Sequence, residues 1–206
     1  MSVVSLIAAN SRLIDFIQVK HNVLSDQICD ELITEYQDDE WLQSTTFDRA
    51  EKFRVSKQLD ISHADLINKN NRRAELDTVI FEAIHPYIVD YASQFKTFLS
   101  IKRDTGYSIL KYEKNEFYRE HTDDPSETIY DPQGSLVASS LDKRKITISI
   151  ALNDNFKGGG LSFFGNTYKP EVKKGEALFF PSWHMFPHQA LPVTEGIRYS
   201  LITWVV

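Results

Sequence analysis

A histidine and an aspartate separated by one residue occur twice in this chain, as His121-x-Asp123 and His63-x-Asp65. An imidazole and a carboxylate that project together can bind one metal ion through nitrogen and oxygen. The first copy ends an aromatic-rich run that predicts a strand, where alternate side chains leave the same face. The second copy follows Ser62, a good N-cap, and on a helix its two side chains would point about 200° apart. The sequence therefore favours the first copy as a metal site.

A third ligand is expected from a neighbouring strand, and two histidines near the C-terminus are candidates. His184 and His188 are four residues apart, a spacing that would place them on one face of a helix. Pro181 and Pro187 argue against a helix there. The spacing alone leaves both histidines open as the third ligand.

Arg198 and Ser200 follow ten and twelve residues after His188 and would share one face of a strand. A buried arginine that faces a pocket is costly unless an anion meets it, and its planar guanidinium suits a carboxylate. Two histidines and one carboxylate leave coordination positions open, as in non-haem Fe(II) oxygenases. These residues together indicate an Fe(II) site beside a dicarboxylate. The ligand 2-oxoglutarate would occupy the open coordination positions and bind the arginine through its far carboxylate.

The composition narrows the class of protein. The 206 residues include 23 Lys and Arg against 29 Asp and Glu, a formal net charge of −6 that argues against nucleic acid as a partner. Cys29 is the only cysteine, so a reducing compartment is the simpler assumption. The apolar stretch 3–9 predicts a buried terminal segment, and no run reaches the ~20 apolar residues that span a bilayer. We expect a cytoplasmic protein with no membrane partner.

The two halves of the chain differ in their hydrophobic patterns. Helical spacing predicts helices over 24–36, with Ser25 as the N-cap, and over 73–95, where Pro86 should kink or split the helix. Short strands are expected near 53–55 and 59–61. We therefore expect residues 1–104 to form a mainly helical support region.

From residue 105 onward, short β-rich runs follow one another between turn residues. They are 107–112, 117–122, 145–152, 161–164, 177–180 and 198–206. This pattern predicts an α+β fold in which a jelly-roll barrel over 105–206 is braced by the N-terminal helices, as one compact domain. The unpatterned stretch 124–143 directly follows the first two ligands, and we expect a mobile lid over the substrate there.

Residues from about 105 to 206 resemble the 2-oxoglutarate- and Fe(II)-dependent dioxygenases, most closely the prolyl 4-hydroxylase branch. The resemblance rests on Tyr112, Tyr118-x-x-His121-x-Asp123, "ITISIALND" with "GGGLSFF", "KKGEALFFPS", and Pro187-His188 followed by Pro192-Val193-x-x-Gly196-x-Arg198-Tyr199-Ser200. The family fold is a double-stranded β-helix, a jelly-roll barrel braced by N-terminal helices. These motifs occur in the same order and spacing over half of the chain.

The resemblance implies the roles of the site residues. His121, Asp123 and His188 would bind the iron, Arg198 the far carboxylate of 2-oxoglutarate, and Tyr112 would place its hydroxyl on this cosubstrate. Ser200 would add a further hydroxyl there. Two departures are notable: Ala151 occupies a position where some relatives carry a cosubstrate contact, and collagen-type prolyl hydroxylases usually have Lys where Arg198 stands.

The implied activity is hydroxylation of an unactivated C–H bond with O2, Fe(II) and 2-oxoglutarate, giving succinate and CO2, with ascorbate as a supporting reductant. A peptidyl proline in a protein or peptide is the first expected substrate. A free amino acid or small metabolite is the second, and a cupin-like metal-binding module without turnover is the alternative of another class. Retention of Asp123 argues against the halogenases of the superfamily, which lose this carboxylate.

Overall fold

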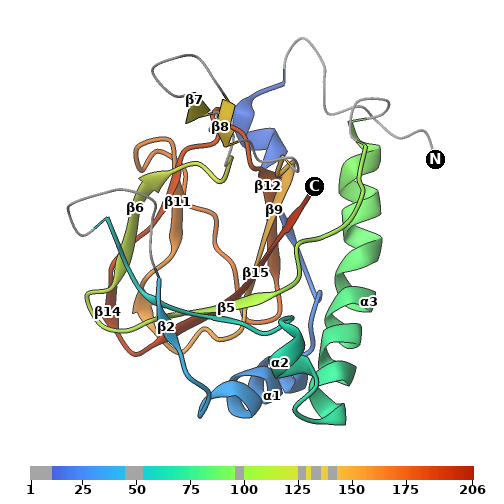
Figure 1. Cartoon of the computed structure of the whole chain (residues 1–206). Coiled ribbons are helices and arrows are strands. Elements are labelled where there is room, and N and C mark those ends of the chain that lie inside the picture. Colours follow the sequence, from blue (N-terminus) through green and yellow to red (C-terminus); the bar gives the residue numbers. More distant parts are fainter. Residues whose placement is uncertain (1–10, 45–52, 96–99, 125–128, 131–135, 139–142) are drawn as a thin grey trace.

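The computed structural model describes residues 11–44, 53–95, 100–124, 129–130, 136–138 and 143–206. Two β-sheets face each other, and the long helix packs outside the larger sheet (Figure 1). This is the double-stranded β-helix, so the expected α+β jelly-roll barrel braced by helices is confirmed. The apolar stretch 3–9 lies outside the described residues.

The larger sheet has seven strands in the order β1-β12-β9-β15-β5-β4-β2. Their bounds are β1 Gln18–Lys20, β12 Ala177–Pro181, β9 Ile146–Ala151, β15 Arg198–Val205, β5 Ser108–Tyr112, β4 Lys57–Asp60 and β2 Leu42–Gln43. The smaller sheet has the order β11-β13-β6-β3, with β11 Leu161–Phe163, β13 His188–Ala190, β6 Phe117–His121 and β3 Arg54–Val55. Two antiparallel pairs complete the described strands: β10 Lys157–Gly158 with β14 Val193–Glu195, and β7 Ile129–Tyr130 with β8 Leu136–Ala138.

Alternation along the central strands gives the larger sheet two different faces. On β9, Ile146, Ile148 and Ile150 point outward into the main apolar core, which the helices share. Thr147 and Ser149 alternate with them and point into the barrel, where both are buried. The sheet is therefore apolar toward the helices and partly polar toward the barrel interior.

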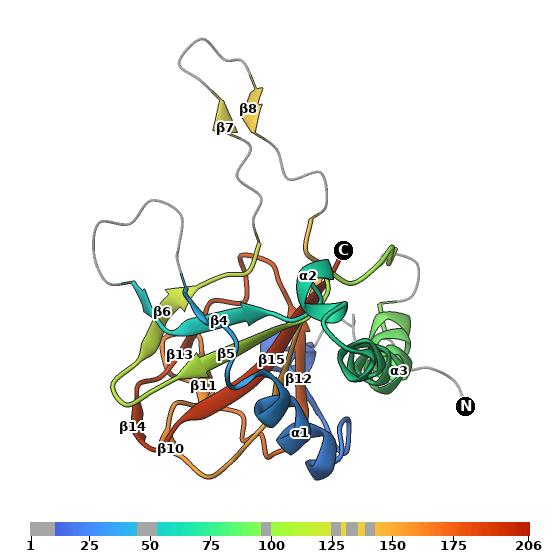
Figure 2. The ribbon, with the colours of Figure 1, turned by 60° about the horizontal axis from the view of Figure 1, so that its bottom comes forward.

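The helices cover the outer face of the larger sheet, as Figure 2 shows from another direction. Helix α1 spans Asp26–Tyr36, and the Ser25 side chain accepts a hydrogen bond from the Ile28 backbone, as the sequence predicted. Helix α3 spans Asn71–Ser93, begins at the N-cap Asn70, and packs on the sheet through Leu76, Ile80, Ile84 and Ile88. A 3-10 helix, η1, spans Leu13–Phe16.

Two features of the helices differ from the predictions. Helix α3 runs through Pro86 as one element, so the predicted split is wrong, while the alternative of a kink stays a prediction. Its buried face continues on both sides of the proline, from Ile80 and Ile84 to Ile88 and Tyr91, so tertiary packing outweighs the lost backbone hydrogen bond. The short helix α2, Ala64–Ile67, is capped by His63 rather than Ser62, because the His63 imidazole accepts from the Asp65 backbone.

The first 104 residues contribute more than helices. Strands β1, β2 and β4 join the larger sheet and β3 joins the smaller one. The patterns near 53–55 and 59–61 predicted β3 and β4, but β1 and β2 were not predicted. The division of the chain at residue 104 stays a prediction.

Most of the predicted lid, 124–143, lies outside the described residues. Its described strands β7 and β8 pair with each other, and Figure 2 draws this pair apart from the barrel. Among the described residues, no helix has the length and hydropathy needed to cross a membrane.

Candidate metal centre and cosubstrate cavity

Two paired strands of the smaller sheet bring three polar side chains together. His121 ends β6, His188 begins β13, and the two residues are directly opposite each other in the antiparallel pair. Asp123 lies two residues beyond His121 and is buried. One ligand atom from each of the three side chains lies within 4.8 Å of the others. The structure therefore brings together the three residues that the sequence suggested as metal ligands.

A β-bulge in β6 determines which side chain accompanies His121. His188 pairs with His121 and Ala190 pairs with Tyr118, so three steps along β6 oppose two steps along β13. The additional residue allows positions three apart to face the same side. Tyr118 stacks on His121, with ring centroids 3.4 Å apart and ring planes inclined by 16°. Simple alternation along this strand does not predict that contact.

Backbone carbonyl groups orient both imidazoles. His121 Nδ1 lies 2.8 Å from the Arg119 carbonyl oxygen, and His188 Nδ1 lies 3.1 Å from that of Phe186. Because a carbonyl oxygen only accepts, each Nδ1 carries the proton and donates it. In the neutral rings, each Nε2 therefore keeps a free lone pair, and these atoms lie 3.5 and 3.6 Å from the Asp123 carboxylate oxygens.

The charge states of the cluster suit a metal. Burial lowers the pKa of His188 to about 4, although the Asp123 carboxylate opposes this shift. Burial works against the charge on Asp123, but His188, His121 and the Thr147 hydroxyl together hold its pKa well below the ordinary value. Thr147 Oγ1 donates to Asp123 at 2.8 Å. At neutral pH the carboxylate is ionised and the His188 imidazole is neutral, as metal ligands must be.

The donor set fits a divalent metal ion. Two imidazole lone pairs and a carboxylate that face one another repel unless a cation lies between them. A mixed set of two nitrogens and one oxygen, with other coordination positions open, suits Fe(II). His121, Asp123 and His188 could thus hold Fe(II).

A buried arginine lies deeper in the same barrel. Arg198 begins β15, pairs with Tyr112 on β5, and its guanidinium carbon is 5.2 Å from the centroid of the Tyr112 ring. Arg198 is 8% exposed, and burial lowers its pKa. Among the described residues no carboxylate pairs with it. Ser200 Oγ, two residues along the same strand face, is also buried and has no hydrogen-bond partner in the described part of the chain. This guanidinium and hydroxyl could hold a carboxylate.

Gly159 leaves room for the arginine side chain. A Cβ atom at this position would lie 2.8 Å from Val193 and 3.3 Å from Arg198 Cδ, and the residue has φ +66°. Only glycine meets both requirements without strain. Part of the motif "GGG" thereby allows the Arg198 side chain to lie where it does.

The remaining sequence candidates lie elsewhere or play other parts. His184 is exposed on the loop between β12 and β13 and does not belong to the three-residue cluster. His63 and Asp65 are exposed at the start of α2, so the second His-x-Asp copy has a local structural role. Ala151 pairs with Ser200 on β9 and adds no polar group to the cavity.

The sequence reading missed one basic residue at the site. Arg144 lies over the Trp204 ring, with its guanidinium carbon 3.6 Å from a ring centroid, and its charge interacts with Asp123. Trp204 pairs with Thr147, the residue that donates to Asp123, so both point into the barrel near the metal ligands. The period of two from Arg198 to Trp204 could have placed the tryptophan there. Arg144 lies two residues before β9, and no local sequence pattern predicts its position at the site.

Comparisons with known proteins agree with this geometry. Residues 107–206 match the family model of the 2OG-Fe(II) oxygenase superfamily. A search among curated proteins found no match to the sequence.

Solved prolyl hydroxylases have the same fold over 92% of this chain. A viral collagen prolyl hydroxylase from Paramecium Bursaria Chlorella virus-1, in a 2OG complex, is 19% identical, with a TM-score of 0.65 and 95% of its own chain covered. A prolyl hydroxylase from Trichoplax adhaerens, in complex with a hypoxia inducible factor oxygen degradation domain peptide fragment, is 19% identical, with a TM-score of 0.70 and 83% covered. A Pseudomonas putida prolyl-4-hydroxylase is 18% identical, with a TM-score of 0.59 and 92% covered.

At identities of 18–19%, the solved structures establish the fold alone. The match to the superfamily comes from the family model. Residues 107–206 of this chain match the 2OG-Fe(II) oxygenase superfamily, and its fold is that of the solved prolyl hydroxylases.

Proposed function

We propose that this protein is an Fe(II)- and 2-oxoglutarate-dependent hydroxylase that acts on a prolyl residue of a peptide. The observation that carries the proposal is the pairing of two features in one barrel. His121, Asp123 and His188 lie within 4.8 Å of one another, and the buried Arg198 has no acidic partner among the described residues. A metal ion and a dicarboxylate would satisfy both features.

Each residue has a defined part in this proposal. His121, Asp123 and His188 hold Fe(II), while Arg198 and Ser200 bind the far carboxylate of 2-oxoglutarate and Tyr112 contacts the cosubstrate. Bound iron and 2-oxoglutarate supply the oxidative chemistry, which consumes O2 and releases succinate and CO2. The protein residues position these groups and exclude water from them. Ascorbate belongs in the assay as the reductant that keeps the iron in its ferrous state.

Two hydrogen-bond donors near the three-residue cluster support a peptide as substrate. Arg144 has no carboxylate partner among the described residues, and the buried Trp204 Nε1 has no hydrogen-bond acceptor. Both groups donate hydrogen bonds only, so an acceptor on the substrate would complete them. A peptide carbonyl oxygen is such an acceptor. The solved prolyl hydroxylase bound to a peptide fragment has the same fold and adds support for this substrate class.

The test uses the full chain with Fe(II), 2-oxoglutarate, ascorbate and O2. A set of proline-containing peptides is compared with matched peptides in which alanine replaces proline. We expect succinate release coupled to the gain of one oxygen atom in the proline peptides alone. Oxygen transfer to free amino acids but not to peptides would overturn the prolyl assignment, and a folded protein that binds neither metal nor 2-oxoglutarate would overturn the whole proposal.

Arg144→Met separates peptide binding from the other steps. The KM for the peptide should rise about tenfold or more, because a charge-assisted hydrogen bond is lost. The dissociation constant for 2-oxoglutarate should change little, since Arg144 packs on Trp204 at the other end of β15 from Arg198. An unchanged peptide KM would remove Arg144 from the substrate site.

A further inference from the structure

A stack of three side chains lies behind the first metal ligand. The Tyr118 ring is stacked on His121, and the Arg54 guanidinium carbon lies 4.8 Å from the centroid of the same Tyr118 ring. Phe53 meets Tyr118 edge to face at 5.7 Å. Arg54 and Tyr118 are directly opposite each other in the β3–β6 pair. The stack therefore extends from an N-terminal strand to the metal centre.

Arg54 is itself held in place. Its Nε donates to Ser56 Oγ at 3.0 Å, and its Nη2 lies 3.4 Å from Gln58 Oε1. Ser56 is fully buried, so the first of these bonds is protected from water. A guanidinium fixed in this way gives the tyrosine ring a defined cationic neighbour.

The hydrogen bond from Nδ1 leaves the His121 imidazole free to tilt, and the contact with Tyr118 removes this freedom. The hydrogen bond from Nδ1 to the Arg119 carbonyl sets the tautomer of the ring. A single hydrogen bond still permits the ring plane to tilt about it. The parallel contact with Tyr118 sets that plane, and the Nε2 lone pair then points toward Asp123 and His188.

We infer that Arg54 and Tyr118 are positioning residues for the metal ligand His121. The inference rests on the proposed function, because it assumes that His121 binds metal. It extends the metal centre to β3, which lies outside the family-matched residues 107–206. Partners that orient a metal-bound histidine typically change metal affinity about 10- to 100-fold when they are removed.

The sign of the effect distinguishes positioning from plain electrostatics. Arg54 is a cation near a cation site, so its charge alone disfavours metal binding. On electrostatic grounds, Arg54→Ala should strengthen the affinity for a metal ion. Positioning predicts the opposite, a two- to fivefold weaker affinity on the order expected for a cation–π contact. Tyr118→Ala should weaken it about tenfold or more.

The experiment measures Mn(II) binding to the full chain by titration followed with electron paramagnetic resonance. Tyr118→Phe keeps the ring and should bind within about twofold of wild type, and Arg54→Lys should recover part of the loss. Lys57→Ala is the matched control. It removes one positive charge from β4, the next strand along the chain, where Lys57 pairs with Glu113 and not with Tyr118. Urea unfolding of every variant tests whether a loss of Mn(II) affinity comes from a loss of folding stability.

A second readout needs no metal. The His121 ring protons lie beside the face of Tyr118 and should resonate upfield in proton–nitrogen correlation spectra of the metal-free protein. Tyr118→Leu should move them toward their free position, while Nδ1 stays protonated. Wild-type and variant proteins with equal Mn(II) affinity and equal His121 shifts would overturn the inference. Wild-type protein that binds no Mn(II) would instead overturn the proposed function.

Discussion

Two regions of this molecule bury arginine side chains, and they differ in what surrounds the charge. Between α1 and α3, Arg73 is buried and donates to Glu35 at 2.7 Å and to Asp39 at 2.6 Å. In the barrel, Arg198 is equally buried but has no carboxylate partner among the described residues. The protein itself pairs the first charge with two carboxylates, although Arg73 Nη1 has no hydrogen-bond partner among the described residues. In the proposed function, an anion from outside, the 2-oxoglutarate carboxylate, pairs with the second charge.

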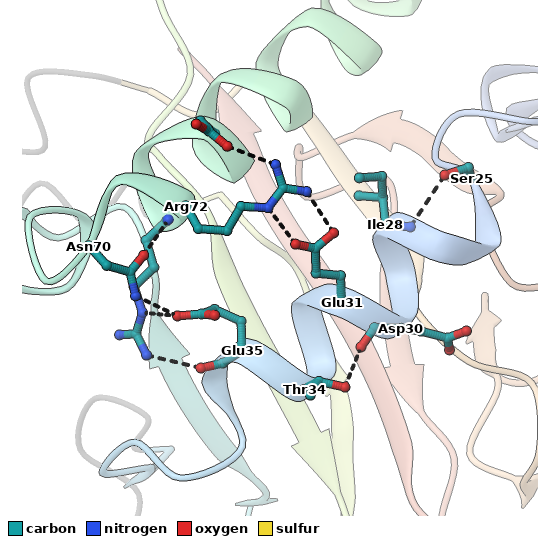
Figure 3. Close-up of polar contacts among 10 residues, drawn as sticks. Ser25, Ile28, Asp30, Glu31, Thr34, Glu35, Asn70 and Arg72 are labelled. Carbon is teal, nitrogen blue, oxygen red and sulfur yellow. Dashed lines mark hydrogen bonds and ion pairs between the residues drawn. The ribbon is translucent and has the colours of Figure 1, made fainter.

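The helix pair carries a dense set of such contacts, which Figure 3 shows in part. Arg72 on α3 forms a fork with both carboxylate oxygens of Glu31 on α1, and Asn70 donates to Glu35. These bonds orient the two helices on the outer face of the larger sheet. Charged groups in this region serve the fold.

The barrel interior has the opposite character. Among the described residues, the hydroxyl of Ser200 and the indole N–H of Trp204 are buried without partners, and two histidine Nε2 atoms face one carboxylate. Unsatisfied buried groups reduce stability, so their presence beside the three-residue cluster supports the proposal that a ligand binds there. The contrast separates charges that hold the chain from charges that await a ligand.

Asp123→Asn should have the largest effect. Loss of the only carboxylate ligand should abolish measurable Fe(II) binding and turnover, a greater loss than the ~100-fold typical of residues that merely orient ligands. Isothermal titration with Mn(II) measures the binding. Asp65→Asn in the second His-x-Asp copy is the matched control and should bind metal like wild type. Equal metal binding by both variants would contradict the assignment.

Removing each buried arginine should act on stability in opposite directions. Arg73→Met removes the shared cation from Glu35 and Asp39, which keep only Asn70 and Lys69 as partners, and should lower the free energy of unfolding by about 3–5 kcal/mol. Arg198→Met removes an unpaired buried charge and should leave that free energy unchanged or raised when no cosubstrate is present. Urea unfolding of both variants measures the difference.

For 2-oxoglutarate binding, Arg198→Met should have the larger effect and Arg73→Met the smaller one. Arg198→Met should lose 2-oxoglutarate affinity by about 10- to 150-fold for each charge-assisted hydrogen bond, at about 1.5–3 kcal/mol per bond. Folded Arg73→Met should bind the cosubstrate like wild type. A large loss of stability in Arg198→Met would mean that this arginine holds the fold and would refute the contrast.

Acid should weaken the helix contacts. A hydrogen bond from Arg73 lowers the pKa of Glu35, and hydrogen bonds from Arg73 and Lys69 outweigh the burial of Asp39 and lower its pKa as well. Because the folded pKa values lie below the unfolded values of about 4, this stability is complete above pH ~5 and is lost as the pH falls through the folded values. Unfolding free energy measured from pH 7 to 3 should fall more steeply in wild type than in Arg73→Met. Parallel curves would show that these carboxylates contribute little.

Ser200→Ala should have the smallest effect. It removes an unpartnered buried hydroxyl, so stability should stay constant or rise slightly. Affinity for 2-oxoglutarate should fall about two- to tenfold, as for one ordinary hydrogen bond. Competition binding measures this change, and Thr203→Val is the control, since Thr203 Oγ1 is also unpartnered but lies on the other face of β15. An equal loss in both variants would exclude a specific contact from Ser200.

Local sequence patterns predicted most of the long elements. The alternation in "ITISIA" and "RYSLITWV" placed β9 and β15, and Ser25 marked the start of α1. Short elements were missed, above all β13, which is three residues long between Pro187 and Pro192. Strands of that length carry too little pattern and form because β6 and β11 pair with them.

The sequence by itself determined which residue types form the three-residue cluster, their order along the chain, and the barrel with its helical support. Those properties follow from residue chemistry and from periods of two and about 3.6 residues, both of which are local. Tertiary structure alone decided that His188 and not His184 joins the cluster, that a bulge stacks Tyr118 on His121, and that Arg144 and Arg54 lie near the metal ligands. These contacts join segments far apart in the chain, and strand pairing rather than local preference sets the distances between them.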